Sequence, residues 1–330
     1  MSETARPEFE QQDEKEQRLT LIQHEAAALI PSAVHLPVAS AEKGYYELPL
    51  LKEPSWTWEI PLYFFIGGAA GTASVIAGIA EVTGASPKLV RDARRFSIAG
   101  AILSPALLIS DLGRPERFLA MLRVFKPQSP MSVGVWILMG FSAGTTAANA
   151  GGWMRARSMF PVLAALLQKL GDVVALLFGL PFASYTGVLI GATVIPTWNC
   201  NASLLPGHFL ASGLGASVGM LELAGNNERA LQLLGLGTAV AETAVGARIE
   251  LQDNPAEEPL KRGASGWLIR LGGVLSGPVP LALRAVSLFM KPKRAMKLRK
   301  YAAVSAVVGS AITRVAWVQA GHVSARESRP

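Results

Sequence analysis

Eight long runs of apolar residues follow one another along the chain, and polar residues gather between them. A helix needs about 20 mostly apolar residues to cross a bilayer. The pattern therefore predicts an all-α integral membrane protein, with a bundle of eight transmembrane helices within residues 56–325. The expected spans lie near 58–82, 93–112, 132–151, 170–194, 203–223, 229–249, 264–289 and 301–320.

Two of these runs have less definite limits. Arg270, Arg284 and the sequence GPVP at 277–280 interrupt the seventh run, and the fourth can begin earlier because apolar residues resume at Phe160. The first run contains GGAAG at 67–71, a set of small residues that favours close contact between helices.

Composition agrees with a membrane class. Half of the residues are hydrophobic, 17% are charged, and the mean hydropathy is +0.33. Soluble domains carry roughly 25% charged residues. The net charge of +7 lies in the segments between the runs, so it does not indicate a nucleic-acid partner.

Residues 1–55 are different, because they are polar, acidic and contain no run long enough to span a bilayer. They hold ten Asp and Glu against five Lys and Arg. No basic segment leads into an apolar one, so a cleaved signal peptide is not expected. We expect a soluble tail, in which residues 18–30 form a short amphipathic helix that docks on a partner, or else a disordered terminus.

The distribution of Lys and Arg predicts how the chain is oriented. With eight spans, both termini lie on one side of the membrane. On the opposite side, segments 84–95, 152–169, 224–230 and 290–300 carry 14 Lys and Arg. On the terminal side, segments 113–131, 195–202, 250–263 and 321–330 carry 8, with the acidic residues 1–55 left out of the count. Because cytoplasmic segments are enriched in these residues, both termini are expected in the periplasm, with the chain in the inner membrane of a bacterium.

Cysteine and histidine limit the redox centres that this chain can hold. Cys200 is the only cysteine, whereas an iron–sulfur cluster needs about four thiolates. Of the four histidines, only His208 lies well inside an expected span, and His322 lies at the far end of the last one. A transmembrane di-haem site needs facing pairs. We therefore expect no haem, cluster or other metal in the chain.

Several polar side chains are expected at one depth, near the outer leaflet. Charges within hydrocarbon are costly, so such residues call for a reason. Counting successive helices as alternately inward and outward places six residues in that half of the bundle: Glu59, Asp111, Ser132, Trp136, Tyr185 and His208.

Each of these residues also has a purely structural interpretation. The tryptophans at 56, 58, 136 and 198 fit an aromatic belt at the membrane surface. Asp111 can cap a turn or pair with Arg114, and Glu59 can pair with an arginine of the 113–131 segment. His208 can form a hydrogen bond inside the bundle.

Together, a carboxylate, a tyrosine and a histidine within reach of lipid suit a quinone. Its two carbonyl oxygens accept hydrogen bonds, and its redox chemistry moves protons with electrons. A carboxyl group whose pKa is tuned by its surroundings can relay those protons. Glu59 is the candidate for this relay.

Three acids are expected deeper or toward the other side: Asp172, Glu222 and Glu242. Arg248 and Arg314 are expected in the outer portions of their helices, and Gln168 completes this second set. They form either a polar path for protons or buried ion pairs that determine how the helices pack.

Four motifs carry a family resemblance: WTWEIPLYFFIGGAAG, SDLGRPERF, SPMSVGVW and SYTG, in this order. Over roughly residues 45–320 the chain resembles the NrfD/PsrC family, the membrane subunits of polysulfide-reductase-like respiratory complexes. The resemblance implies an eight-helix bundle without haem that exchanges electrons between menaquinol or ubiquinol and a four-cluster iron–sulfur subunit. That subunit docks on the terminal side and serves a molybdopterin oxidoreductase.

The resemblance also implies roles for individual residues. Tyr185 matches the fourth-helix tyrosine near the quinone head group, and Glu59 and Tyr63 lie where relatives place quinone-binding polar residues. Some relatives have Asn and His there, which this chain lacks. Asp111 and Arg114 match the motif of the second helix.

The sequence thus predicts a quinone-reactive membrane subunit of a respiratory oxidoreductase complex. A multi-helix transporter or proton-translocating subunit is an alternative, although the two halves show no convincing repeat. The other alternative is a structural anchor that binds no quinone.

Overall fold

The structure of the protein is a computed structural model that describes residues 51–113 and 116–327. The expected helix at 18–30 and Arg114 lie outside the described residues.

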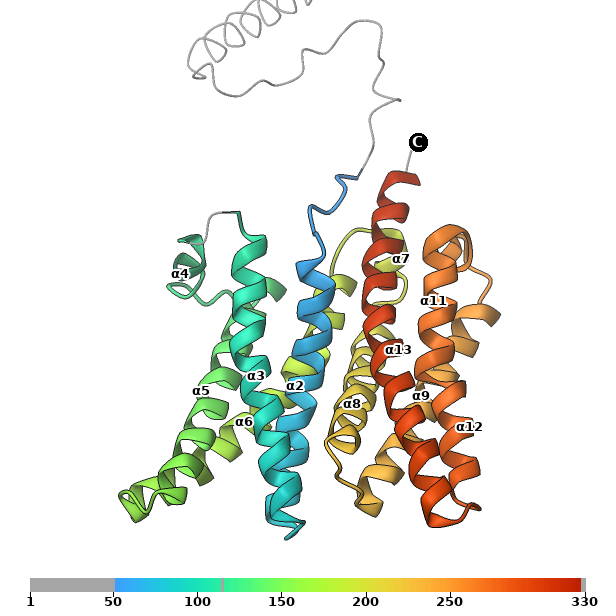
Figure 1. Ribbon diagram of the computed structural model, residues 1–330. Coiled ribbons are helices and arrows are strands. Elements are labelled where there is room, and N and C mark those ends of the chain that lie inside the picture. The colour runs from blue at the N-terminus through green and yellow to red at the C-terminus, as the bar shows by residue number, and fades with distance from the viewer. Residues whose placement is uncertain (1–50, 114–115, 328–330) are drawn as a thin grey trace, which may run out of the picture. The chain divides into compact units, whose positions relative to one another are not determined.

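Within the described ranges all regular structure is helical, without strands (Figure 1). The long helices are α2 (Glu59–Val82), α3 (Pro87–Asp111), α5 (Pro130–Ala156), α6 (Pro161–Gly191), α8 (Leu205–Leu223), α9 (Arg229–Leu251), α11 (Gly263–Ser276), α12 (Pro278–Ser287) and α13 (Pro292–Glu327). The short ones are α4 (Arg117–Met121), α7 (Pro196–Asn199), α10 (Glu258–Lys261) and the 3₁₀ turn η2 (Pro255–Glu257).

Six of the eight expected spans are helices long and apolar enough to cross a membrane: α2, α5, α6, α9, α11 with α12, and α13. The other two are also helices, α3 with 25 residues and α8 with 19. Their sequences are less apolar, because α3 begins with a cluster of charged residues and α8 contains several glycines together with His208 and Glu222.

Two helices begin before the first limits expected for their spans. Helix α6 begins at Pro161, the earlier start that the apolar residues from Phe160 indicate. Helix α13 begins at Pro292 rather than near 301, and its first turns lie ahead of its apolar run. Helical hydrogen bonds close within the helix itself, so a helix continues into water where its residues favour it. The basic residues at 293–300 are good helix formers, and proline suits the first turn of a helix.

The seventh span is broken, as its sequence indicates. Helix α11 ends at Ser276, and α12 begins at Pro278 after Gly277. Proline lacks the amide hydrogen that would continue the helix, and its ring clashes with the carbonyl four residues earlier.

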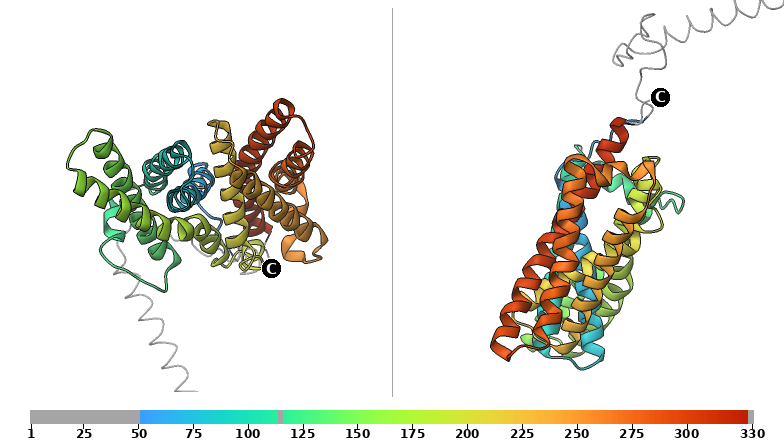
Figure 2. Two further views of the ribbon diagram at one scale, coloured as in Figure 1. Left: turned by 90° about the horizontal axis from the view of Figure 1, so that it is seen from below. Right: turned by 90° about the vertical axis from the view of Figure 1, so that its right-hand side faces the viewer.

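The helices alternate in direction along the chain, as successive membrane spans do. Helices α2, α5, α8 and α11 begin at the end of the bundle where α3, α6, α9 and α13 finish (Figure 1). We call this the terminal end, and the other the opposite end. Figure 2 shows α5 on one side of α2, and α11, α12 and α13 on the other.

Small residues let α2 approach two neighbours closely, as the GGAAG sequence predicts. A Cβ added at Gly71 would lie 2.5 Å from the carbonyl oxygen of Gly179 in α6. A Cβ at Gly213 in α8 would lie 2.9 Å from the carbonyl carbon of Gly68. Since real side chains do not approach this closely, only glycine permits these contacts, which hold α2 between α6 and α8.

Candidate functional site

A cavity of about 70 Å³ lies at the terminal end, between α2, α3, α5 and α6. Its walls are mostly apolar, and its polar side chains are Tyr63, Tyr185 and Asp111. The full lining is Trp56, Ile60, Tyr63, Phe64, Leu108, Asp111, Leu112, Met121, Met131, Gly134, Val135, Tyr185 and Leu189. The structure therefore brings together three of the seven residues that the sequence singles out.

The position of Tyr185 depends on a glycine of the neighbouring helix. Tyr185 is 7% exposed, and its ring lies directly against Gly134 of α5. A Cβ added at Gly134 would lie 1.8 Å from Tyr185 Cζ and 2.1 Å from its hydroxyl oxygen. Sequence reasoning missed this role of Gly134, although the glycine lies within the SPMSVGVW motif.

Tyr63 supplies a second hydroxyl to the same cavity. Its side chain is 2% exposed and packs against the rings of Phe64 and Phe182, with centroids 5.7 and 6.2 Å away. Among the described residues, neither the Tyr63 hydroxyl nor the Tyr185 hydroxyl has a hydrogen-bond partner. Buried tyrosine hydroxyls usually have one. The cavity therefore presents two unused donors.

Two carboxylates lie close together where α2 begins and α3 ends. The Thr57 hydroxyl donates to Glu59 and lies 3.4 Å from Asp111 Oδ1. Asp111 lines the cavity, whereas Glu59 is half-buried beside it. No described arginine pairs with Glu59, so its expected ion pair with the 113–131 segment is not found in the described part.

Ser132 and Trp136 lie at the expected depth but not in the cavity lining. The Ser132 hydroxyl accepts a hydrogen bond from the Lys126 amide at 3.0 Å, which fastens the loop before α5. Trp136 is 41% exposed and packs edge-on against Phe125. Each lies two residues from Gly134, about 200° around the helix, so both point away from Tyr185.

The aromatic-belt interpretation fits the exposed rings of Trp58 and Trp136 but is wrong for Trp198. That side chain is fully buried, and its indole Nε1 donates to the Trp317 carbonyl oxygen at 2.8 Å. Trp56 stacks on it, with ring centroids 5.3 Å apart.

His208 is also apart from the cavity, so its expected place with Tyr185 is wrong. It is buried, and its Nδ1 lies 3.1 Å from Glu242 Oε1 in α9. The Ser276 hydroxyl donates to the other oxygen of Glu242 at 2.7 Å. His208 therefore lies in a polar contact between α8 and α9 and does not line the cavity.

The deeper polar residues lie mainly in separate contacts. Glu222 accepts two hydrogen bonds from Arg284, at 2.7 and 2.6 Å, and Asp172 pairs with Arg94. Arg314 is fully buried, donates to the Phe209 carbonyl oxygen at 2.6 Å and lies 3.7 Å from the centroid of its ring. Arg248 is exposed. These contacts favour ion pairs that join helices.

The segment before α2 is fastened to the end of α13. Glu53 accepts from Arg326 and lies 3.0 Å from His322 Nδ1. These partners, Arg326 first, lower the pKa of the Glu53 carboxyl from 4.5 to about 2. Three residues later, Trp56 lines the cavity and stacks on Trp198. The Glu53 contact therefore supports one wall of the cavity.

This contact predicts a pH dependence. Because the folded pKa of Glu53 is depressed, its contribution to docking is fully present above pH 4.5 and is lost as the pH falls through about 2. The exciton couplet of the Trp56–Trp198 stack in far-ultraviolet circular dichroism is expected to weaken over that range. Glu53→Gln should show the weakened signal already at pH 7, and Lys52→Gln should not. A couplet that survives both acid and Glu53→Gln would contradict the prediction.

Comparison with known proteins gives one clear result. The family model described as "Polysulphide reductase, NrfD" matches residues 50–227, more than half of the chain. The match runs from the segment before α2 to the end of α8 and includes every residue that lines the cavity. A search of the curated proteins finds no match. The chain is a membrane protein and belongs to the NrfD family.

Proposed function

We propose that this chain is the quinone-reactive membrane subunit of a respiratory oxidoreductase complex. The observation that carries the proposal is the cavity at the terminal end, which is lined by two buried tyrosines whose hydroxyls have no hydrogen-bond partner among the described residues. Membership of the NrfD family supports it.

The donor set fits a menaquinone or ubiquinone head group. Tyr63 and Tyr185 donate to carbonyl oxygens, while apolar side chains such as Ile60 and Leu189 contact the ring. The cavity of about 70 Å³ is smaller than typical ligand pockets of about 300–1,000 Å³. Met121 and Met131 belong to the lining, and flexible methionines are the side chains best able to move aside.

The two carboxylates handle protons in this proposal. A bound quinol supplies two electrons and two protons when it is oxidised, and a quinone takes up the same number when it is reduced. Asp111 exchanges protons with the cavity, and Glu59, joined to it through Thr57, exchanges them with water at the terminal end.

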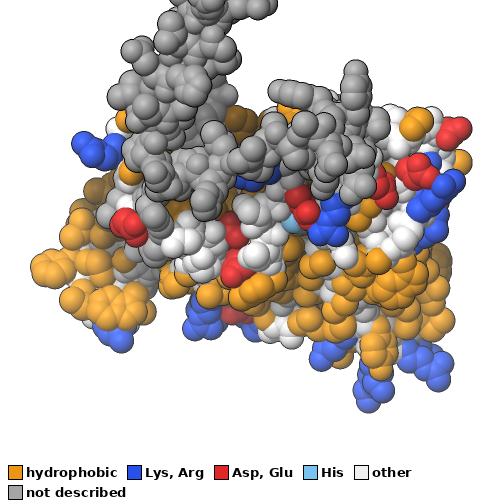
Figure 3. All heavy atoms as spheres, turned by 90° about the horizontal axis from the view of Figure 1, so that it is seen from above, with side chains coloured by type: hydrophobic (Ala, Val, Ile, Leu, Met, Phe, Trp, Pro, Cys, Tyr) orange, Lys and Arg blue, Asp and Glu red, His pale blue; other side chains and the backbone are white. Residues whose placement is uncertain are grey.

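The electrons pass between the quinone and a partner protein. We place a four-cluster iron–sulfur subunit at the terminal end, next to the cavity, and a molybdopterin-type catalytic subunit beyond it. Figure 3 shows this end, where acidic and basic side chains both occur among apolar ones. The distribution of Lys and Arg supports a bacterial inner membrane with this end in the periplasm.

Tyr185→Phe tests the proposal in the intact complex. Losing one neutral hydrogen bond costs about 1 kcal/mol, so quinol-dependent electron transfer should fall about fivefold to tenfold. Tyr301→Phe, at a 65% exposed position of α13, should have no effect. Glu59→Gln should lower turnover while quinone-analogue affinity is kept.

Other outcomes would favour the alternatives. If Tyr63→Phe and Tyr185→Phe both leave turnover and analogue affinity unchanged, the quinone site is not here. A complex that binds no quinone analogue at all would support a structural anchor. Solute uptake by vesicles that contain the chain without a redox partner would support a transporter.

A further inference from the structure

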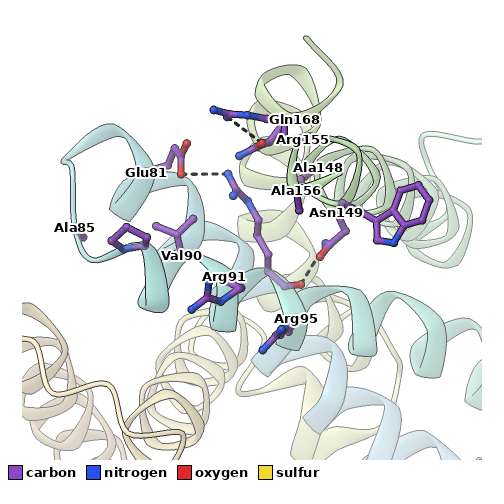
Figure 4. A pocket seen from close by; sticks show the side chains of 14 residues that line it. Glu81, Ala85, Val90, Arg91, Arg95, Ala148, Asn149, Arg155, Ala156 and Gln168 are labelled. Atoms are coloured by element: carbon purple, nitrogen blue, oxygen red, sulfur yellow. Dashed lines mark hydrogen bonds and ion pairs between the residues drawn. The ribbon is translucent and has the colours of Figure 1, made fainter. Parts of the chain in front are cut away.

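A second and larger cavity lies at the opposite end of the bundle. Its volume is about 750 Å³, and side chains of α2, α3, α5 and α6 line it. Figure 4 shows arginines from two of these helices around it, Arg91 and Arg95 of α3 and Arg155 of α5. None of its lining residues belongs to the quinone cavity.

Basic side chains outnumber acidic ones around this cavity. Four arginines line it, the fourth being Arg94, against one acid, Glu81. The charge of Arg94 is neutralised, because its guanidinium donates to Asp172 and its Nη2 lies 3.3 Å from Glu81 Oε2. In contrast, Arg91 and Arg155 have no carboxylate within ion-pair distance among the described residues.

The walls of the cavity are held in place by contacts between helices. Asn149 of α5 donates to the Arg94 carbonyl oxygen at 3.3 Å, which joins α5 to α3 (Figure 4). The Arg155 Nη1 donates to Gln168 Oε1 of α6 at 3.2 Å, and Gln168 is buried. A Cβ at Gly151 would lie 2.5 Å from the Gln168 amide nitrogen, so α5 and α6 are in close contact here. These contacts hold α3, α5 and α6, and therefore the backbone of each arginine, in place around the cavity.

The surroundings place the cavity at a membrane surface. It lies where α2 ends and α3 begins, and the end of α2, a helix able to span a membrane, is expected near a membrane surface. Trp153, a lining residue, is 53% exposed, as is common for tryptophan in the interfacial layer. Ile102 lies seven residues after Arg95, on the same side of α3, and is 64% exposed. An apolar strip therefore leads from the arginines toward the bilayer centre.

We propose that this cavity binds the phosphodiester head group of an anionic phospholipid. Guanidinium groups match phosphate oxygens in pairs, and basic pockets between transmembrane helices suit such head groups. The volume lies within the range of about 300–1,000 Å³ that is usual for ligand sites. The acyl chains extend along the exposed apolar side of α3. The lipid holds α3 and α5 together at the end where the Asn149 side chain already joins them.

The test measures lipid retained by the purified complex in native mass spectra, with cardiolipin, phosphatidylglycerol or phosphatidylcholine added in detergent. Wild-type protein should retain the two anionic lipids and not phosphatidylcholine. Each basic residue near a membrane surface adds about 1 kcal/mol to anionic-lipid binding. Arg91→Gln with Arg155→Gln should therefore weaken retention about thirtyfold.

A matched control distinguishes lipid binding in this cavity from general electrostatic attraction between anionic lipid and the basic end of the bundle. Lys293→Gln with Arg294→Gln removes the same charge at the same end, from the start of α13, and neither residue lines the cavity. It should change retention less than about threefold. Gly152→Leu fills the cavity without changing charge, since no atom lies within 4 Å of its added Cβ. It should also reduce retention, which supports the site even if the double arginine variant fails to assemble.

Two results would overturn the proposal. If the α13 control loses as much lipid as the arginine variant, retention reflects the net charge of this surface. If glycerol 3-phosphate or inorganic phosphate displaces the lipid at equal concentration, the site serves a soluble phosphate.

Discussion

Replacing Gly134 by alanine is expected to abolish binding of a quinone analogue. The new methyl group would lie 1.8 Å from Tyr185 Cζ, far inside van der Waals contact, so the ring must move. The space next to it is the cavity of about 70 Å³, and a displaced ring fills much of it. We expect analogue affinity to fall at least about a hundredfold, because ring contacts and the Tyr185 hydrogen bond are lost together. Fluorescence quenching or calorimetry with the assembled complex measures this.

The choice of alanine makes the result easy to interpret. Alanine is a better helix former than glycine, by roughly 1 kcal/mol, so α5 itself is not weakened. Gly237→Ala in α9 is the matched control, because no atom lies within 4 Å of its added Cβ, and it should bind the analogue like the wild type. Unchanged affinity in an assembled Gly134→Ala complex would show that the quinone does not bind beside Tyr185.

The largest effect on stability is expected from Glu222→Gln. Glu222 and Arg284 are 4% and 3% exposed, and their two hydrogen bonds join α8 to α12. Removing one partner of a buried ion pair leaves the other charge without compensation and costs about 3–5 kcal/mol. Gly235 of α9 makes room for this guanidinium, since a Cβ there would lie 2.4 Å from Arg284 Cζ.

A double variant distinguishes an ion pair from general disruption. Glu222→Met combined with Arg284→Met removes both charges, and stability should be well above that of Glu222→Gln, because replacing a buried pair by hydrophobic residues of similar volume is often neutral. Glu258→Gln is the surface control. It breaks an exposed pair with Arg262 and should change stability by less than about 1 kcal/mol. Thermal loss of the helical signal in detergent measures all four proteins. A double variant no more stable than Glu222→Gln would contradict this account.

Depth along the bundle could be predicted from the sequence, but orientation around each helix could not. Counting spans placed Tyr185, Asp111, Ser132, Trp136 and His208 toward the terminal end, and the structure agrees. Only Tyr185 and Asp111 among these five line the cavity. Successive residues differ by about 100° around a helix, so a residue at the right depth can face any neighbour. Which side of α5 faces α6 depends on contacts at Gly134, Gly144 and Gly151, residues that carry no chemistry.

The ion pairs also could not be predicted from the sequence, because they depend on which helices are neighbours. The sequence indicated that Glu222, Glu242 and Arg314 are costly inside a membrane, and so have partners or a function. It did not indicate that Glu222 pairs with Arg284, 62 residues away, because that contact exists only once α8 and α12 are neighbours. The partner of Asp172, Arg94, lies in a different helix in the same way.

By itself, then, the sequence determined the helical class, most of the spans, the break at Gly277 and the end of the bundle where the polar motifs gather. These follow from the polarity of consecutive residues, because a bilayer selects segments by hydrophobicity and length. Only the tertiary structure decided which hydroxyls share a cavity, which acids meet a base, and that a basic cavity opens at the opposite end. Those features depend on the rotation and close packing of helices far apart in the chain, where a single methyl group at Gly134 determines whether a ring fits.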